Sequence, residues 1–428
     1  MELSHEPVRM CSLLALCSVS CCADDTTPQA IALTQRSATH FYQRPDREVT
    51  SDGLFSTRYD TTATLMRGYG LYTRLAKESG NWIWELQQNW RSPGFEVNDL
   101  SIISRVDYRW MNGNLAHQWL TPGRFYRSAF LSYGGQQQYN YDGLRTDLEQ
   151  YAFNSIEFNN YWVMRAYWGH THSVNDDRLS RGGPVLGSVG NDYYQLGVST
   201  DPRGRAVWNI QNGVGVGFDG TKSWSLSPGV AIKPVGNVFV QLSPSWNWSQ
   251  NAAQYVTTVK DPTATTFGGS RYVFGYITTR TLSIDTRVNW TIRPELTMQL
   301  FAQPFVASGD YKNFREFAAP RTDRKLDYGR DVGTITKSAA RYTVDPDGAG
   351  PAAAFSFADP NFTSHSLRGT AVLRWEYRPG STMFFVWTQQ RSGNDLYGDL
   401  DFRRDSGALL ADRPENVFLV KATYWLGR

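Results

Sequence analysis

Two histidines and two aspartates are the first residues whose types and spacing could do chemistry. His170 and His172 are two positions apart near the expected outer end of a strand, so both side chains point the same way. Asp176 and Asp177 follow in the next loop. Imidazole and carboxylate groups of this kind can hold a divalent metal. Only two strand ligands are in hand, so the alternative is that these residues form the polar rim of a sheet.

A second candidate is an acidic stretch within the longest expected loop. Residues 345–350 read Asp-Pro-Asp-Gly-Ala-Gly, so that two carboxylates alternate before a glycine turn, as in calcium-binding loops. Ala349 occupies the position where a third acid is expected, and this removes a ligand. Asp345 and Asp347 are therefore the calcium candidates, and the sequence indicates no cofactor.

Enzyme signatures with a defined local structure are missing from the sequence. It contains no G-x-S-x-G turn, zinc-binding helix motif, phosphate-binding loop or dinucleotide fingerprint. Paired carboxylates for glycoside hydrolysis stay open, but no pair of acids has a context that singles it out. We therefore assign no catalytic residue and turn to the elements that must position the polar side chains.

Composition favours a chain with many strands. The 428 residues include 37 Gly, 15 Trp and 23 Tyr, which suits tight turns and aromatic belts. No run of about 18 apolar residues is present, which excludes a transmembrane helix in the body of the chain. The net charge of +3 arises from basic and acidic residues spread along the whole length. Without a basic stripe, nucleic acid is excluded as a partner.

The first residues differ from the rest. All four cysteines lie between Cys11 and Cys22, so neither disulfides nor thiolate metal sites are expected elsewhere. The apolar stretch from Met10 to Val19 resembles the core of a secretory or lipoprotein signal. We expect residues 1–29 to be such a segment or a mis-assigned start of the gene, and residues 30–428 to form one domain.

The body of the chain is built from strands with two different faces. From Thr281 to Ile292 apolar residues alternate with polar or charged ones, and after a reversal at residues 293–295 the alternation continues to Phe305. A period of two indicates a strand between two different media. One such hairpin is compatible with both a soluble sandwich and a membrane barrel. How often the hairpin recurs, and how its connections alternate, distinguishes the two fold classes.

Short turns and long connections alternate along the chain. Seven tight turns, rich in Pro, Gly, Asn and Asp, are expected at residues 77–81, 121–124, 159–160, 201–204, 233–237, 293–295 and 378–381. Longer connections are expected at residues 92–100, 133–145, 173–191, 251–270, 307–365 and 392–414. This sorting is typical of barrels with short periplasmic turns and long extracellular loops. With flanking strands at residues 31–42 and 416–427, we predict an all-β, antiparallel, up-and-down transmembrane barrel of about sixteen strands.

Charged residues on the polar face are expected to line a lumen. These lumen-lining residues are Glu85, Arg91, Asp285, Arg287, Arg374, Glu376 and Lys421. They carry both signs, so they would select polar solutes or form ion pairs that keep a wide barrel from collapsing. The connection at residues 307–365 is far longer than a hairpin needs, and we expect it to constrict the lumen.

The last strand carries Phe418, Val420, Tyr424 and Leu426 on one face. It resembles the signal that the outer-membrane insertion machinery reads. We expect this strand to pair with the first one, because closure leaves no unsatisfied edge in lipid.

Five stretches resemble the bacterial domain-of-unknown-function family 5916. They are QRSATHFYQRPD at residues 35–46, RSPGFEVND at 91–99, RGGP at 181–184, QPFV at 303–306 and LRWEYRPGST at 373–382. The resemblance implies an outer-membrane β-barrel, commonly preceded in family members by a domain similar to family 9 carbohydrate-binding modules. It implies no activity, because none is established for the family. That domain and the earlier barrel strands usual in the family are missing here, so the chain is either a short member or the C-terminal part of a larger barrel.

The expected function is a channel or surface platform for polar solutes in the cell outer membrane. A link to carbohydrate binding or uptake follows from the family's usual neighbour domain and from aromatic rings that stack on sugars. Two alternatives stay open: an outer-membrane carbohydrate-active hydrolase, and a structural barrel that anchors a sugar-binding domain. The expected partners are the lipid bilayer, the insertion machinery and saccharides.

Overall fold

The computed structural model describes residues 17–20, 27–47, 59–97 and 103–426. Two α-helices, α1 (Pro28–Arg36) and α2 (Phe402–Ala411), and a short 3-10 helix (Thr265–Phe267) accompany many strands. The strands are β1 (Cys17–Ser20), β2 (Arg67–Lys77), β3 (Trp82–Arg91), β4 (Tyr108–Trp119), β5 (Tyr126–Tyr139), β6 (Arg145–Phe158), β7 (Val163–Thr171), β8 (Val174–Asp176), β9 (Leu186–Ser188), β10 (Asn191–Ser199), β11 (Ala206–Gly217), β12 (Lys222–Ile232), β13 (Val238–Lys260), β14 (Ser270–Arg293), β15 (Leu296–Phe317), β16 (Lys325–Asp327), β17 (Thr334–Ser338), β18 (Arg341–Asp345), β19 (Phe355–Ala358), β20 (Phe362–Arg378), β21 (Ser381–Asp395) and β22 (Glu415–Ala422).

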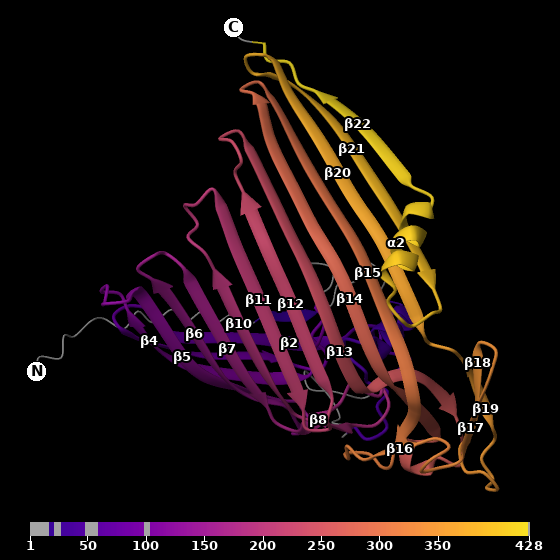
Figure 1. Cartoon of the computed structure of the whole chain (residues 1–428). Helices are drawn as coiled ribbons and strands as arrows, with labels where there is room; N and C mark the ends of the chain where they lie inside the picture. Colours follow the sequence, from indigo (N-terminus) through magenta and orange to yellow (C-terminus); the bar gives the residue numbers. More distant parts are fainter. Residues whose placement is uncertain (1–16, 21–26, 48–58, 98–102, 427–428) are drawn as a thin grey trace, which may run out of the picture.

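One antiparallel sheet contains most of these strands (Figure 1). In the described residues it has seventeen strands, and all except β16 follow one another in chain order as neighbours, from β1 to β7, β10 to β15 and β20 to β22. The seventeenth strand, β16, is a three-residue branch on the end of β15. Smaller sheets form from β17 to β19 and from β8 and β9. The predicted all-β, antiparallel, up-and-down sheet with sixteen successive strands is confirmed.

All seven predicted tight turns connect neighbouring strands. Gly80 and Gly380 in the first and last of these turns have φ values of 83° and 74°, the left-handed region that glycine enters without a steric penalty. Five of the six predicted longer connections are partly strand. β5 continues to Tyr139, β13 to Lys260, β15 to Phe317 and β21 to Asp395, and residues 173–191 contain β8 and β9.

The prediction of a first strand at residues 31–42 is wrong, because this segment begins in helix α1. Thr27 caps the helix by accepting a hydrogen bond from a backbone N–H of the first turn, and Pro28 occupies the first turn. Ile31 and Gln35, one turn apart, form its buried side. The sheet instead begins with β1, which pairs with the start of β2 and lies in the segment expected to be signal-like.

The predicted closure of the sheet by its last and first strands is not present among the described residues. There β22 pairs with β21 alone, whereas β1 pairs with β2. The two edge strands also differ in length, with eight residues in β22 and four in β1. The side chains of Val417 to Val420 at this edge are 55–75% exposed.

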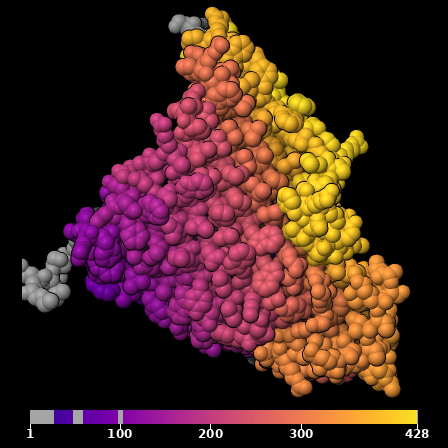
Figure 2. All heavy atoms as spheres, viewed as in Figure 1, coloured from indigo at the N-terminus to yellow at the C-terminus, as the bar shows by residue number. Residues whose placement is uncertain are grey.

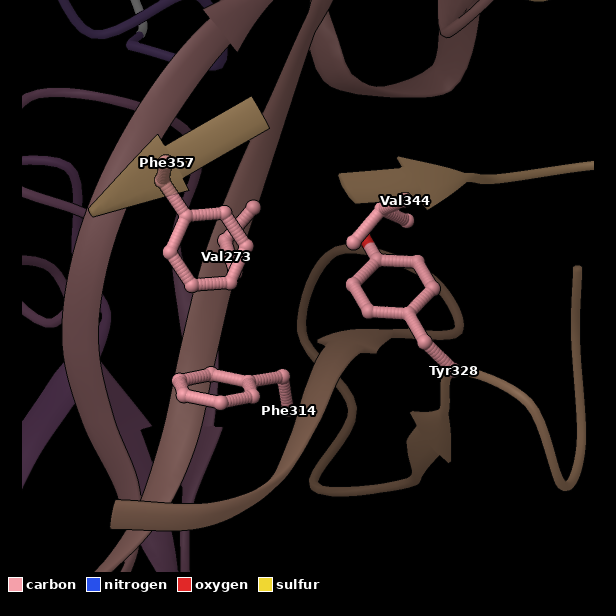
Figure 3. Close-up of a cluster of buried hydrophobic side chains, with 5 residues drawn as sticks. All are labelled: Val273, Phe314, Tyr328, Val344 and Phe357. Carbon is pink, nitrogen blue, oxygen red and sulfur yellow. The ribbon is translucent and has the colours of Figure 1, made fainter. Parts of the chain in front are cut away.

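The three longest strands continue well past the length that a bilayer requires. β13, β14 and β15 contain 23, 24 and 22 residues, which is about 75 Å at ~3.3 Å per residue. Towards the loop ends of these strands lies a hydrophobic cluster of Val273, Phe314, Tyr328, Val344 and Phe357 (Figure 3). Figure 1 shows the small sheet of β17 to β19 beside the ends of the long strands. The longest connection is therefore folded around a core that it shares with Val273 of β14, and its role in constricting a lumen stays a prediction.

One face of the large sheet is apolar from strand to strand. Cross-strand pairing aligns Trp168, Tyr194, Val214, Trp224 and Trp248 in a single row across five strands. Figure 2 shows residues from successive parts of the chain side by side across the visible surface, from indigo to yellow. Tyr194 is 51% exposed and Val214 and Trp224 are each 38% exposed, so no second protein layer covers them within the described residues.

Neither helix in the described part of the chain is long and apolar enough to cross a membrane.

Candidate solute site on the polar face

The other face of the sheet is polar and forms its own hydrogen-bonded rows. Arg74, Gln87, Asn112, Gln136 and Glu149 are paired in register across β2 to β6. The amide of Gln136 donates to the Glu149 carboxylate at 3.0 Å. Because successive side chains of a strand point to opposite faces, these side chains lie on the face opposite the apolar row.

The register places all seven predicted lumen-lining residues on this polar face. In β14, Asp285 accepts a hydrogen bond from Gln303 at 2.6 Å, and the Arg287 guanidinium lies 5.5 Å from the centre of the Phe301 ring. In β20, Arg374 and Glu376 form an ion pair at 3.0 Å.

Of the remaining three residues, Lys421 lies in the same cross-strand row as Arg374, because Phe384 is paired with both, whereas Glu85 and Arg91 belong to β3. Glu85 pairs with Arg74 on β2, and Lys421 lies opposite Phe384. Arg91 donates to the Arg105 carbonyl at 3.4 Å and is covered by loop residues. The seven residues thus form local pairs spread over β3, β14, β20 and β22 and not one site, and their role in lining a lumen stays a prediction.

A polar cavity of about 500 Å³ lies where the polar face meets the long connections. Glycines leave its floor open, since a Cβ at Gly215 would lie 2.4 Å from the Ser223 hydroxyl and one at Gly217 would lie 2.3 Å from the Thr221 hydroxyl. Most of its other lining groups are polar, although Leu179, Val189 and Val216 also contribute. The polar groups include Ser188, Asn191, Ser249, Asn251, Asp176, Asp219 and Lys325. Carboxylates and an amine are both present, so the lining suits hydrogen bonding to a polar solute more than attraction of one sign of charge.

A second polar cavity, of about 560 Å³, adjoins the first. Tyr139, Arg145, Ser173 and Arg321 are among its lining residues. A hollow of similar size is lined by residues of β2 to β6. It includes Gly113 and Gly135, which the register places on the apolar face, so it is not part of this site.

A buried ionic cluster lies beside these cavities. Arg44 reaches Asp142 at 2.5 Å and both Asp107 and Asp177 at 3.7 Å, and its side chain is 1% exposed. Arg47 pairs with Asp107 as well. The charges are compensated within the cluster, as buried ions require.

Burial changes the protonation of this cluster. It lowers the pKa of His40 from 6.5 to about 4, although a hydrogen bond to the Phe95 carbonyl acts in the opposite direction. Burial by itself would raise the pKa of Asp177, but the guanidiniums of Arg105 and Arg44 bring it below its ordinary value. At neutral pH His40 is therefore uncharged and Asp177 is ionised.

The cluster joins segments that are distant in the sequence into one loop layer, which we define as residues 37–47, 92–97, 103–107, 140–142 and 176–187. Arg178 donates to the Thr39 carbonyl at 2.8 Å, and the Val185 N–H donates to the Asp46 carboxylate at 2.8 Å. Three of the five stretches behind the family resemblance meet here.

Sequence reasoning missed this layer because it assigned residues 31–42 to a strand. The charges of Arg36 and Arg44 near His40 were the available signal against a lipid-crossing strand.

The histidine and aspartate group does not converge on a metal site. His170 Nδ1 lies 2.9 Å from Asp192, while His170 and His172 have ring centres 4.5 Å apart. Asp176 accepts hydrogen bonds from the backbone of the next turn, and Asp177 belongs to the ionic cluster. In the part of the chain that the structure describes, no group of three or more His, Cys, Asp or Glu side chains is placed to hold a metal.

The calcium candidates stabilise a turn. Asp345 accepts from the Gly348 N–H and Asp347 accepts from the Ala352 N–H, each at 2.9 Å. The two carboxylates are thus bound to the backbone of their own loop, and none of the residues that the structure describes brings a third acid to them.

Comparison with known proteins agrees with the resemblance in the sequence. No curated protein is significantly similar to the chain. A solved structure described as a bacterial polysaccharide outer membrane secretin has 9% sequence identity and a TM-score of 0.33, with 83% of this chain and 89% of that chain covered. No conclusion about fold or function follows from a likeness at that level. A family model matches residues 39–427, and the chain therefore belongs to the family described as domain of unknown function DUF5916.

Proposed function

We propose that the protein is an outer-membrane β-barrel that serves as a channel or surface platform for polar solutes. The observation that carries this proposal is the sheet itself, whose apolar face is exposed while its opposite face is lined with polar and charged side chains. Exposed apolar surface of this width marks contact with lipid or protein. Lipid explains why the apolar row continues from strand to strand instead of forming one patch.

The proposal requires the edges of the sheet to be completed. Unpaired backbone N–H and C=O groups cost several kcal/mol each in hydrocarbon, so an open β22 is not stable in a bilayer. Completion would come from pairing of β22 with β1 and β2, or from further strands between them. In either case the polar face would enclose water.

The polar face and the 500 Å³ cavity support a polar solute with little net charge. Serine hydroxyls, amides and exposed glycine backbone form the cavity, beside the carboxylate of Asp219 and the amine of Lys325. Such a lining matches a molecule with many hydroxyl groups. We therefore propose saccharides as the solutes. The sugar-binding-like domain that commonly precedes the barrel in family members is a second reason for this choice.

A second candidate is a structural barrel that anchors another domain and conducts nothing. The loop layer favours it, because a buried ionic cluster with Arg44 at its centre holds several loops together on the polar side of the sheet. The hydrolase alternative has no comparable support, since the acids of this cluster are occupied by arginines.

Fractionation and electrical recording test the proposal. The full chain should appear in the membrane fraction, need detergent for extraction, and give ohmic current steps in planar bilayers. Folded protein in the aqueous fraction without detergent would refute the membrane location. Membrane insertion without current would favour the anchor over the channel.

A further inference from the structure

Three tyrosine rings lie next to one another on the polar face of the sheet. Tyr151, Tyr167 and Tyr193 belong to the neighbouring strands β6, β7 and β10. The ring centres of Tyr151 and Tyr167 are 6.4 Å apart and their planes are nearly parallel, at 16°. The ring centres of Tyr167 and Tyr193 are 6.3 Å apart. We refer to these three side chains as the tyrosine track, which crosses three strands.

Glycines give the rings room to lie against the sheet. A Cβ at Gly134 would lie 2.8 Å from Tyr151 Cζ, and a Cβ at Gly213 would lie 2.5 Å from the Tyr193 hydroxyl oxygen. A ring that lies over a glycine backbone has one face covered and leaves its other face towards the polar side. All three tyrosines of the track are half-buried, as expected for rings in this position.

Hydrogen-bonding groups lie at the edges of the rings. The Asn112 amide donates to the Tyr151 hydroxyl at 2.9 Å, and the Tyr167 hydroxyl donates to the Glu149 carboxylate at 2.8 Å. Gln136 donates to the same carboxylate at 3.0 Å. The track therefore combines apolar ring faces with amide and carboxylate groups beside them.

The track leads to the polar cavity of about 500 Å³. Cross-strand pairing places Tyr151, Gly169, Tyr193, Gly215 and Ser223 in one row over β6, β7, β10, β11 and β12. Gly215 and Ser223, at the end of this row, line the cavity. One extended ligand can therefore contact aromatic rings along the first part of the row and backbone and hydroxyl groups along the second.

We propose that the tyrosine track binds an oligosaccharide, whose sugar rings stack on Tyr151, Tyr167 and Tyr193 and whose following units enter the cavity. A pyranose ring has a face of apolar C–H groups and a rim of hydroxyls, which matches an aromatic face with hydrogen-bonding groups at its edge. Three rings in succession over adjacent strands suit a chain of sugars more than a single one. The inference rests on the proposed function, because the track lies on the face assigned to water.

Two neighbouring tyrosines on opposite faces of β10 provide matched variants. Tyr193→Leu removes a ring of the track, whereas Tyr194→Leu removes a ring of the apolar face, where Tyr194 is 51% exposed. Binding of maltohexaose and of cellohexaose to the full chain in lipid nanodiscs is measured by titration calorimetry. We expect saturable binding of at least one hexaose, about fivefold weaker in Tyr193→Leu and unchanged in Tyr194→Leu. Tyr193→Phe keeps the ring and should bind as the parent does.

A measurement on the parent covers the case in which Tyr193→Leu does not fold. Tetranitromethane nitrates accessible tyrosines, and fragment-ion mapping separates Tyr193 from Tyr194. A saturating concentration of the hexaose should slow nitration of Tyr193, because a stacked sugar covers its free face, and should leave nitration of Tyr194 unchanged.

The outcomes separate the track from the channel. Absence of binding of both hexaoses to the parent overturns the track, whatever current the parent carries. Equal binding by folded Tyr193→Leu and Tyr194→Leu overturns it too, and so does unchanged nitration of Tyr193 when Tyr193→Leu does not fold. Hexaose binding that depends on Tyr193, without current in planar bilayers, supports the track and refutes the channel, which leaves the platform.

Discussion

Replacing Arg44 with methionine tests whether the ionic cluster holds the loop layer on the sheet. Methionine keeps most of the side-chain length but removes the guanidinium that Asp107, Asp142 and Asp177 share. Removing one partner of a buried ion pair costs about 3–5 kcal/mol, because the other charge stays buried. Arg47 still reaches Asp107 and Arg105 still reaches Asp177, so we expect the lower end, about 3 kcal/mol.

Hydrogen exchange in the membrane-folded protein measures this change locally. The reporters are the Tyr141 N–H, which donates to Asp107, and the Val185 N–H, which donates to Asp46. A loss of about 3 kcal/mol corresponds to exchange about 100-fold faster at these amides. Amides in the middle of β13 should keep their rates.

A surface pair provides the matched control. The Arg203 side chain is 60% exposed and pairs with Asp201 at 2.7 Å, so Arg203→Met should leave the exchange rates nearly unchanged, because solvent screens an exposed ion pair. Adding Asp142→Asn to Arg44→Met removes the carboxylate whose ion pair is with Arg44, and it should recover part of the loss. If Arg44→Met and Arg203→Met have the same effect at Tyr141 and Val185, the cluster does not hold the layer and the reasoning fails.

Three further predictions address other parts of the molecule. The pKa of His40 is about 4 in the folded state and 6.5 when the side chain is exposed, so docking of residues 37–47 should weaken as pH falls from about 6.5 to 4, by about 3 kcal/mol in total. Hydrogen exchange at the Val106 N–H, which donates to the Thr39 carbonyl, should become faster over this range. His40→Gln should remove this pH dependence. Trp224→Lys on the apolar face should destabilise the protein in vesicles by up to about 2–4 kcal/mol in urea titrations, whereas Ser225→Lys on the polar face should be nearly neutral, and equal effects would contradict the assignment of the two faces. Val344→Ala in the fully buried cluster should lower its local stability by about 2 kcal/mol, seen as faster proteolysis between β17 and β19, and the exposed Ser338→Ala should not.

Local patterns determined the strands, their order and their faces. Alternation with a period of two depends on backbone pleating alone, so Asp285 and Arg287 could be assigned to one face without knowing what lies beside them. The tight turns were equally local, because Pro, Gly, Asn and Asp at the reversals specify backbone angles within a few residues. Antiparallel neighbours then followed from the short connections, which leave a strand no other place to pair.

Contacts between loops could not be derived in the same way. Arg44 and Asp142 are 98 positions apart and belong to segments without periodicity, so no local pattern links them. The helix at Pro28–Arg36 was missed because its capping signal competes with an alternation that also fits a strand. The hairpin of β8 and β9 was predicted as plain loop, since three-residue strands carry no periodic signal.

The sequence by itself therefore determined that this is a sheet of sixteen strands with one apolar and one polar face. The tertiary structure decided where the charges of the loops meet, where the polar cavities lie and that the edges stay open in the described chain. The physical reason is the range of each interaction: pleating and turn geometry act over a few residues, whereas ion pairs, cavities and edge pairing depend on segments brought together by the fold.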